Sequence, residues 1–342
     1  MGKEIKRYSI DQCALYKCRS KRRLEQLLCI EAGGLKEIEN IISYHSFDTD
    51  KKCTKKSQVA EKRKITAPNA ILKQIQARIL YLLQKVERPD WLISGEKGKC
   101  YIDNGKAHLL GTYVLTVDIK KFYDNCKREP VYRFFVDTLR TSNDVAAKLT
   151  DIVTFSDGIP TGCPTSQLLA FYAYQKMFTE INDVALVSNC KFTLYVDDMT
   201  FSSITPFNPK ILAREVDKIL RKYGHKPKYR KVKYYSKHDP KPITGTIVTP
   251  EHTLDVPNNL QMKIYTNFQD IKHRQGEAVI SIDEEKLLLR LKGQIQAAQN
   301  IDEARFPEIK RITSQISLSP QKSSQKPHTK KAKRIRIPPM VK

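Results

Sequence analysis

The sequence predicts an α+β protein built around an antiparallel sheet with helices on one face. Residues 113–119 alternate in polarity as a strand does, with Thr116 and Asp118 on the side opposite the apolar residues. Residues 191–203 alternate on both sides of Asp197–Asp198, which indicates a β-hairpin with two acids at its turn. The order strand, helices, hairpin, helix, strand is typical of a ferredoxin-like core.

The helices around these strands have recognisable ends. We expect one helix to begin after Asn69, and another to run from Pro209, capped by Asn208, to a stop at Gly224. Helical patterns also cover 131–151, a stretch from Pro164 through Phe178, and parts of 255–318. Weaker patterns predict short helical pieces in 1–50, a basic loop or surface hairpin at 51–64, a basic strand region at 226–237, a turn-rich stretch at 243–259, and a disordered, acid-free basic tail at 319–342.

The charge of the chain indicates a polyanionic partner. Its 342 residues include 61 Lys and Arg against 37 Asp and Glu, a formal net charge of +24. Nucleic acid is the commonest partner of such proteins. A membrane binder would need an amphipathic basic helix or an anchor, and the sequence shows neither. A basic protein of the ribosomal type, without catalysis, stays open as an alternative.

Cysteine usage and hydropathy favour a cytoplasmic protein that does not enter a membrane. The eight cysteines form no CxxC pair and lie near no cluster of histidines, so we expect reduced thiols and no zinc site. The N-terminal residues lack the apolar core of a signal peptide, and no apolar run is long enough to span a bilayer.

Three carboxylates stand out as candidates for catalysis. Asp118 interrupts an apolar strand, and Asp197 and Asp198 are neighbours at a hairpin turn. Adjacent acids repel each other unless they share a cation. Oxygen ligands without His or Cys favour magnesium, with manganese as the alternative ion. Two such ions could clamp both oxygens of an in-line phosphoryl displacement, whereas a single one of these acids would more simply be a turn residue or a solvated charge.

Three segments resemble motifs of reverse transcriptases, in the same order along the chain. Residues 112–125 resemble motif A, GIPTGCPTSQ (158–167) resembles motif B, and YVDD (195–198) resembles motif C. Motif B has Thr161 where these enzymes usually have Gln. The resemblance implies an RNA-directed DNA polymerase with a right-hand architecture of fingers, ferredoxin-like palm and helical thumb. It implies an N-terminal helical region at 1–60, fingers at 61–110, a palm with a fingers insertion at 111–250, a thumb that recognises RNA at 251–318, and the basic tail at 319–342.

Other segments resemble the bacterial retron group of these enzymes. Residues 62–80 are similar to its fingers motif, Tyr101–His108 to an Asn-Ala-x-x-His element, and Ile243–Gly245 to a Val-Thr-Gly element. Gly105 stands for Ala in the first element and Ile243 for Val in the second.

The resemblance also implies a role for particular residues. Asp118, Asp197 and Asp198 would hold two Mg²⁺ ions, and Lys231 would protonate the leaving pyrophosphate. The nucleotide site would contain Arg63, Gly162 and an aromatic sugar gate at Tyr123, for which Phe122 is the competing candidate. The expected nucleic-acid contacts are Ser166, Gln167, Tyr195, Asn104 and His108.

Simpler interpretations stay open for several of these residues. Arg63 and Lys231 lie in basic runs and are as readily explained as solvated cations. Gln167 is also explained as a surface residue of a helix, and His108 as a packed, hydrogen-bonded histidine. Strand alternation favours a core position for Phe122.

A retron enzyme works with specific partners, which the resemblance therefore implies. These are a cognate structured non-coding RNA, deoxynucleoside triphosphates, and the branched multicopy single-stranded DNA (msDNA) that is primed from the 2′-OH of a guanosine in that RNA. A separate effector protein and a role in anti-phage defence in the bacterial cytoplasm are also implied. The alternatives are a diversity-generating or group II intron-like reverse transcriptase, or a non-catalytic RNA-binding protein that keeps the fold.

Overall fold

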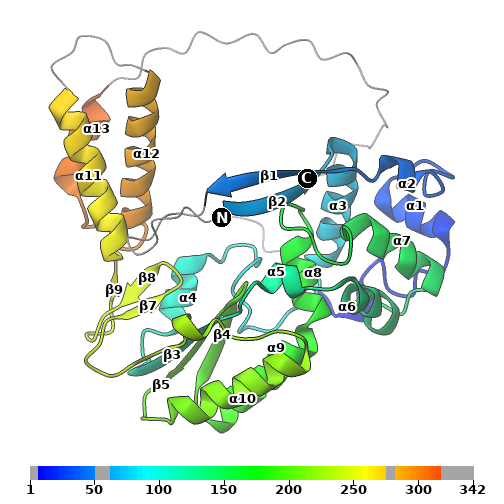
Figure 1. Ribbon diagram of the computed structural model, residues 1–342, viewed down its shortest axis with the longest axis horizontal. Coiled ribbons are helices and arrows are strands. Elements are labelled where there is room, and N and C mark those ends of the chain that lie inside the picture. Colours follow the sequence, from blue (N-terminus) through cyan, green and yellow to red (C-terminus); the bar gives the residue numbers. More distant parts are fainter. Residues whose placement is uncertain (1–6, 51–61, 275–281, 317–342) are drawn as a thin grey trace.

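The computed structural model describes residues 7–50, 62–274 and 282–316 (Figure 1). The predicted basic tail at 319–342 and most of the predicted loop at 51–64 lie outside these residues. In Figure 1 a bundle of C-terminal helices stands at one end of the molecule and α1, α2 and α7 at the other. None of the helices in the described ranges combines the length and the apolar character that crossing a membrane requires.

A four-stranded sheet forms the centre of the molecule. Its strands lie in the order β4-β5-β3-β6, and every neighbouring pair is antiparallel. The strands are β3 (Tyr113–Asp118), β4 (Lys191–Tyr195), β5 (Asp198–Ser203) and β6 (Lys233–Tyr235). Helices connect β3 to β4, and one helix, α10 (Pro209–Lys222), connects β5 to β6. The predicted order of strand, helices, hairpin, helix and strand is therefore confirmed, and the strand arrangement is that of a ferredoxin-like unit.

One face of this sheet is apolar and is covered by helices. The strand register places Leu115 beside Phe201 and Val117 beside Met199, and all four side chains are buried. They share a core with α9 (Gln175–Val187) and α10. Because side chains alternate along a strand, the other face carries the intervening polar residues.

That polar face is covered too, by a short helix and a second sheet. The helix is α4 (Tyr101–Ala107), and the second sheet comprises β7 (Lys241–Ile243), β8 (Thr246–Val248) and β9 (Leu254–Asp255). Val114 of β3 packs against Ile243 and Val248 of this sheet. The stretch predicted only as turn-rich thus forms two strands that complete a sheet over the polar face.

The N-terminal region departs from the predicted run of short helices. It contains a 3-10 turn at Ile10–Gln12, α1 (Lys21–Leu28) and α2 (Ile38–Ile41), but also a strand, β1 (Tyr44–Asp50), that pairs with β2 (Lys62–Pro68). The prediction of helix for residues 44–50 was wrong because the hydrogen-bonding partner of this strand lies on the far side of a long connection. Local sequence patterns do not report such pairings.

The helix predicted at 131–151 is also not continuous. Residues Arg128–Arg133 form α6, a π-helical turn follows at Phe134–Thr138, and α7 begins at Asn143. The break lies at Arg140, which has a φ of 53°, and the Thr141 amide donates to the Phe135 carbonyl instead of continuing the helix. The remaining elements of this region are α5 (Phe122–Asn125), α7 (Asn143–Val153) and α8 (Ser166–Ala173), and Tyr174 separates α8 from α9.

Two predicted helix starts are confirmed by their caps. In α3 (Ala70–Leu83), the Leu72 amide donates to the Asn69 side chain at 2.8 Å. In α10, the amides of Lys210 and Ile211 donate to the Asn208 side chain at 3.1 and 3.2 Å. Each cap satisfies amides that the first turn of a helix leaves without an internal partner.

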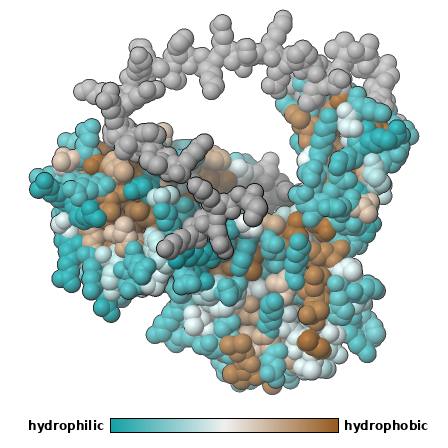
Figure 2. All heavy atoms as spheres, turned by 180° about the vertical axis from the view of Figure 1, so that it is seen from behind, coloured by the Kyte–Doolittle hydropathy of each residue, from teal (hydrophilic) through white to brown (hydrophobic). Residues whose placement is uncertain are grey.

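The C-terminal helices have a core of their own. They are α11 (Asn258–Arg274), α12 (Ile282–Gln299) and α13 (Pro307–Gln315), and their core includes Ile264, Leu291 and Ile295. Seen from behind in Figure 2, this unit presents mostly hydrophilic side chains. It follows directly on β9, so the second sheet attaches it to the rest of the molecule.

Close packing between α4 and β8 gives a test of this arrangement. A Cβ atom at Gly105 would lie 2.3 Å from Thr246 Oγ1, whose hydroxyl already donates to the Ile243 carbonyl. We expect Gly105→Ala to lower the free energy of unfolding by about 1–3 kcal/mol, measured by denaturant titration. Gly293→Ala is the matched control, because a Cβ there meets nothing within 4 Å on a helix. It should be neutral or stabilising, and equal effects of the two substitutions would contradict the contact.

Candidate active site

Three carboxylates meet where β3 ends and β5 begins. The strand register places Asp118 directly opposite Asp198, and Tyr195 of β4 lies on the other side of Asp198. Asp197 belongs to the two-residue turn before β5, and its carbonyl accepts from the Ile119 amide at 3.0 Å. Antiparallel pairing therefore joins acids that are about eighty residues apart in the chain.

The like charges of the three acids repel one another and favour a bound proton or cation. The pKa of Asp198 is raised to about 7, first because the carboxyl is buried and then because Asp197 and Asp118 carry like charges. The Lys231 ammonium, which is hydrogen-bonded to Asp118 Oδ2, acts in the opposite direction. Burial alone would lower the pKa of Lys231, but the bond to Asp118 and the charges of the three acids raise it overall.

The donor atoms of this cluster suit a hard divalent cation. All are carboxylate oxygens, the ligands that magnesium and manganese prefer. Within the residues that the structure describes, no three acidic, His or Cys side chains already surround a common point as metal ligands. The Lys231 ammonium is bonded to one oxygen of Asp118. The ammonium supplies one positive charge for three neighbouring carboxylates. The remaining negative charge favours binding of a metal cation.

The structure brings Lys231 to the acids. The residue ends a 3-10 turn at Tyr229–Lys231, and the Lys228 amide before it donates to the Asp118 carbonyl at 2.7 Å. Although about half of the Lys231 side chain is exposed, its ammonium is bonded to Asp118 and not only to solvent. Of the two interpretations that the sequence left open for Lys231, this position favours a role at the site.

Phe122 and Tyr123 take different positions on α5. Phe122 is buried and packs against Phe178 and His225, so its ring belongs to the core, as strand alternation predicted. Tyr123 is only partly buried, with its ring 5.5 Å from that of Phe122. Of the two sugar-gate candidates, Tyr123 is therefore the one whose ring is partly accessible.

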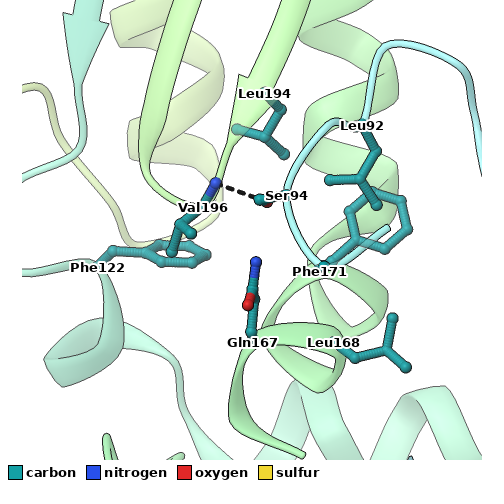
Figure 3. A pocket seen from close by; sticks show the side chains of 9 residues that line it. Leu92, Ser94, Phe122, Gln167, Leu168, Phe171, Leu194 and Val196 are labelled. Carbon is teal, nitrogen blue, oxygen red and sulfur yellow. Dashed lines mark hydrogen bonds between the residues drawn. The ribbon is translucent and has the colours of Figure 1, made fainter. Parts of the chain in front are cut away.

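A small pocket lies beneath the turn that carries the acids. Gln167 of α8 points into it, with the Phe122 ring on one side and the Phe171 ring on the other (Figure 3). The amide end of Gln167 also faces Gly95, where a Cβ would lie 3.3 Å from Nε2. Gln167 is partly buried in this pocket and is thus not a plain helix-surface residue, while its contact with primer and template stays a prediction.

Loop 158–165 is held against β2 by Gly162 and is braced internally by Ser166. The Gly162 amide donates to the Thr66 carbonyl at 2.9 Å, and a Cβ on Gly162 would lie 2.7 Å from that oxygen. Ser166 is buried and its hydroxyl donates to the Pro160 carbonyl. The prediction of a nucleic-acid contact for Ser166 is therefore corrected, because its hydroxyl is used inside the loop. Arg63 lies opposite Thr49 in the β1–β2 pair, and its side chain is outside the described residues.

Sequence reasoning missed Ser94, which contacts the turn between β4 and β5. The Val196 amide donates to Ser94 Oγ at 2.8 Å (Figure 3). The preceding residues run alongside β4, where the Leu194 amide donates to the Trp91 carbonyl and the Ile93 amide to the Leu194 carbonyl. No local pattern identifies Ser94, because its partner lies 102 residues further along the chain.

Comparison with known proteins agrees with this geometry. The model of the reverse transcriptase (RNA-dependent DNA polymerase) family matches residues 53–254, more than half of the chain. The chain belongs to the reverse transcriptase family. Members of this family generally use divalent metal ions, in keeping with the oxygen donors at the acids.

The curated relatives are retron enzymes, so the resemblance to that group is confirmed. The retron Se72 reverse transcriptase of Salmonella heidelberg (strain 579083-10) is 29% identical over 187 residues, 53% of this chain and 47% of the relative. The retron Ec86 enzyme of Escherichia coli is 27% identical over 150 residues, 44% of this chain and 47% of the relative. The retron Ec83 enzyme of Escherichia coli is 24% identical over 255 residues, 71% of this chain and 80% of the relative. The chain thus spans about half the length of the first two relatives.

In this reverse transcriptase the two retron-like elements contact each other. Asn104 of α4 donates through Nδ2 to Thr244 Oγ1 at 2.8 Å, and Gly245 packs against the Tyr101 ring. Thr244 and Gly245 both have positive φ in the turn between β7 and β8. Where the retron element has Ala, Gly105 leaves the space that Thr246 fills.

His108 and Asn104 do not face a nucleic acid, which corrects the predicted RNA contacts. Both side chains are buried. His108 links two strands of the central sheet, with Nδ1 2.6 Å from Ser202 Oγ and Nε2 2.7 Å from Thr193 Oγ1. Burial, with a smaller contribution from the charge of Lys191, lowers the pKa of His108 to about 3. The ring is therefore neutral, as the packed-histidine alternative predicted.

This neutral histidine gives a prediction for stability against pH. Between the folded pKa of about 3 and the ordinary value of 6.5, the unfolded chain binds a proton that the folded protein excludes. Stability from His108 is thus present above pH 6.5 and is lost as the pH falls, by up to about 1.4 kcal/mol per pH unit. We expect His108→Gln, measured by urea unfolding between neutral pH and about pH 5, to show a shallower loss than the wild type.

The comparison isolates His108 from the second buried histidine. Burial also lowers the pKa of His225, to about 4, and this residue is the same in both proteins. Parallel curves of unfolding free energy against pH for the wild type and His108→Gln would show that His108 is not held neutral in the fold.

Proposed function

We propose that the protein is a retron RNA-directed DNA polymerase that makes branched msDNA from a cognate non-coding RNA. The observation that carries the proposal is the placement of Asp118 opposite Asp198, with Asp197 beside them, where burial and the two neighbouring charges raise the pKa of Asp198. Retron relatives and the contact between the two retron-like elements support the narrower assignment over other reverse transcriptase classes.

The proposed reaction is nucleotidyl transfer. A primer hydroxyl attacks the α-phosphorus of a deoxynucleoside triphosphate, a P–O bond forms, the bond to the β-phosphate breaks, and pyrophosphate leaves. Asp118, Asp197 and Asp198 would hold two magnesium ions, which lower the pKa of the attacking hydroxyl and neutralise the triphosphate when bound. Lys231, which is bonded to Asp118, would give a proton to the departing pyrophosphate.

The surrounding elements take roles in a right-hand architecture. The central sheet with α9 and α10 would form the palm, the β1–β2 pair with α3 the fingers, and α11–α13 a thumb that recognises RNA. Tyr123 would exclude the ribose 2′-OH, and Arg63 would contact the triphosphate. Tyr195, which pairs with Asp198 at the end of β4, would support the primer end. We further propose priming from a guanosine 2′-OH, a separate effector protein and a role in anti-phage defence, and the cytoplasmic location stays a prediction.

Removal of one acid tests the enzyme assignment. We expect Asp197→Asn to lower DNA synthesis from the co-purified RNA on the order of 10³-fold or more, because a neutral amide lacks the negative charge that balances the metal ions. RNA binding should stay largely intact. The measurement is incorporation of labelled deoxynucleotides with magnesium, followed by sequencing of the bound nucleic acid for a 2′-branched RNA–DNA product.

The matched control for that experiment is Asp183→Asn, an exposed acid on α9 away from the cluster. It should synthesise DNA as the wild type does. If wild-type protein with its RNA makes no DNA, the polymerase assignment fails, and if it makes unbranched DNA only, the retron assignment fails.

The sugar gate is tested by shortening its ring. We expect Tyr123→Ala to raise the ratio of ribonucleotide to deoxynucleotide incorporation by about 10–100-fold, because a ring beneath the sugar leaves no room for an added hydroxyl. Phe122→Ala should instead destabilise the fold, since that ring is buried against Phe178. Unchanged discrimination in a folded Tyr123→Ala protein would exclude Tyr123 as the gate.

A further inference from the structure

The turn that carries the acids has an unfavourable backbone conformation. Val196 has a φ of 60°, in the left-handed region. Two-residue hairpin turns need such values, and glycine, asparagine and aspartate supply them at low cost. A β-branched residue rarely adopts this conformation, so neighbouring groups must hold it.

Two hydrogen bonds hold the turn from opposite sides. On one side the Ile119 amide, just beyond β3, donates to the Asp197 carbonyl at 3.0 Å. On the other side the Val196 amide donates to Ser94 Oγ at 2.8 Å (Figure 3). The Ser94 side chain is the acceptor for the residue with the strained backbone, and Ser94 is only 5% exposed.

The segment that carries Ser94 is itself firmly anchored. Buried Glu96 forms an ion pair with buried Arg88 and a second one, at 2.6 Å, with the partly exposed side chain of Arg7. Arg88 also donates to the carbonyls of Leu83 and Gln84 at the end of α3. Removing one partner of a buried ion pair is strongly destabilising, so this anchor resists displacement.

An aromatic contact fixes the same segment to the sheet. The Trp91 ring lies 5.3 Å from that of Phe192 on β4 and 5.9 Å from that of Phe171 on α8. Residues 91–94 therefore form a rigid support beside β4, and Ser94 is the point where it contacts the turn.

We propose that Ser94 is a positioning residue for DNA synthesis, acting through the Val196 backbone to set the placement of Asp197 and Asp198. This inference rests on the proposed function. Loss of the acceptor leaves the Val196 amide without its partner and lets the turn relax from its positive φ. Since an error of about 1 Å in a reacting group can cost about 100-fold in rate, the chemical step is affected. Because Ser94 is buried and acts through the Val196 backbone, we expect nucleotide binding to be spared.

A pair of substitutions of equal shape tests the hydroxyl itself. Ser94→Thr keeps the acceptor, whereas Ser94→Val replaces it by a methyl group. We expect Ser94→Val to lower kcat on the order of 10–100-fold with KM for the nucleotide changed by less than about 3-fold. Ser94→Thr should stay within about 3-fold of the wild type on both constants. Thr179→Val is the control for replacing a hydroxyl by a methyl group, because the Thr179 hydroxyl is exposed and bonds within α9. This control should change neither kcat nor KM.

A second substitution separates positioning from general destabilisation. Glycine adopts positive φ without strain, so Val196→Gly placed on Ser94→Val should restore most of kcat. If both Thr and Val at position 94 disturb the packing, Ser94→Ala removes the acceptor without adding atoms. Val196→Gly should then restore most of the kcat that Ser94→Ala loses. Equal kcat in folded Ser94→Thr and Ser94→Val, or no recovery with Val196→Gly, overturns the proposal.

Hydrogen exchange gives a readout that does not depend on polymerase activity. The Val196 amide should exchange faster in Ser94→Val than in Ser94→Thr, because only the latter keeps the acceptor. Wild-type protein that makes no DNA yet shows this difference would refute the proposed function and not the contact. Active protein with identical exchange in the two variants would refute the positioning role alone.

Discussion

The pairing of β3 with β5 is the constraint on which the active site depends. Asp118 and Asp198 face each other only because Leu115 pairs with Phe201 and Val117 with Met199. Side chains alternate between the two faces of a strand. A shift of the β3–β5 register by one residue would therefore expose these apolar side chains and point an acidic side chain into the core. The hydrophobic face therefore fixes the register, and the register fixes the acids. The geometry of the three acids is a consequence of core packing on the opposite face of the sheet.

The polar face meets a different requirement, since its hydroxyls are covered and need partners. Thr193 and Ser202 share the neutral ring of His108, which serves both with its two nitrogens. A charged histidine would be costly there, because burial in a medium of low polarity penalises the ionised form. The same face therefore carries three acids at one end. At the other end it carries the uncharged hydrogen-bond network of His108, Thr193 and Ser202. The positive charge near the acids comes instead from Lys231, which approaches from the segment before β6.

Features with a local cause could be predicted from the sequence. The strands, the hairpin turn and α10 follow from alternation, apolar spacing and capping by Asn208, all encoded within a few residues. The three acids stood out because a local pattern did not explain them. Features that depend on a distant partner could not be predicted. The strand β1 exists because β2 pairs with it, and Ser94 matters because Val196 lies 102 residues away. Burial of His108 and Ser166, which removes them from the expected nucleic-acid surface, likewise depends on segments remote in the chain.

The contact between the retron-like elements has a consequence for the C-terminal helices. The family match ends at residue 254, within β9, and α11 begins four residues later. The second sheet, which ends in β9, packs on α4 through two contacts: Asn104 bonds to Thr244, and Gly105 lies against Thr246. His108 follows α4 directly and is bonded to β5, the strand that begins at Asp198. A groove lined by Tyr101 and Gly245 on one side and by Lys263 and Arg290 on the other lies between this sheet and the helices. A nucleic acid bound in that groove would have its distance to Asp118 and Asp198 set by these few contacts. Under the proposed function, the docking of α4 on the polar face would therefore fix the distance between a nucleic acid in the groove and the three acids.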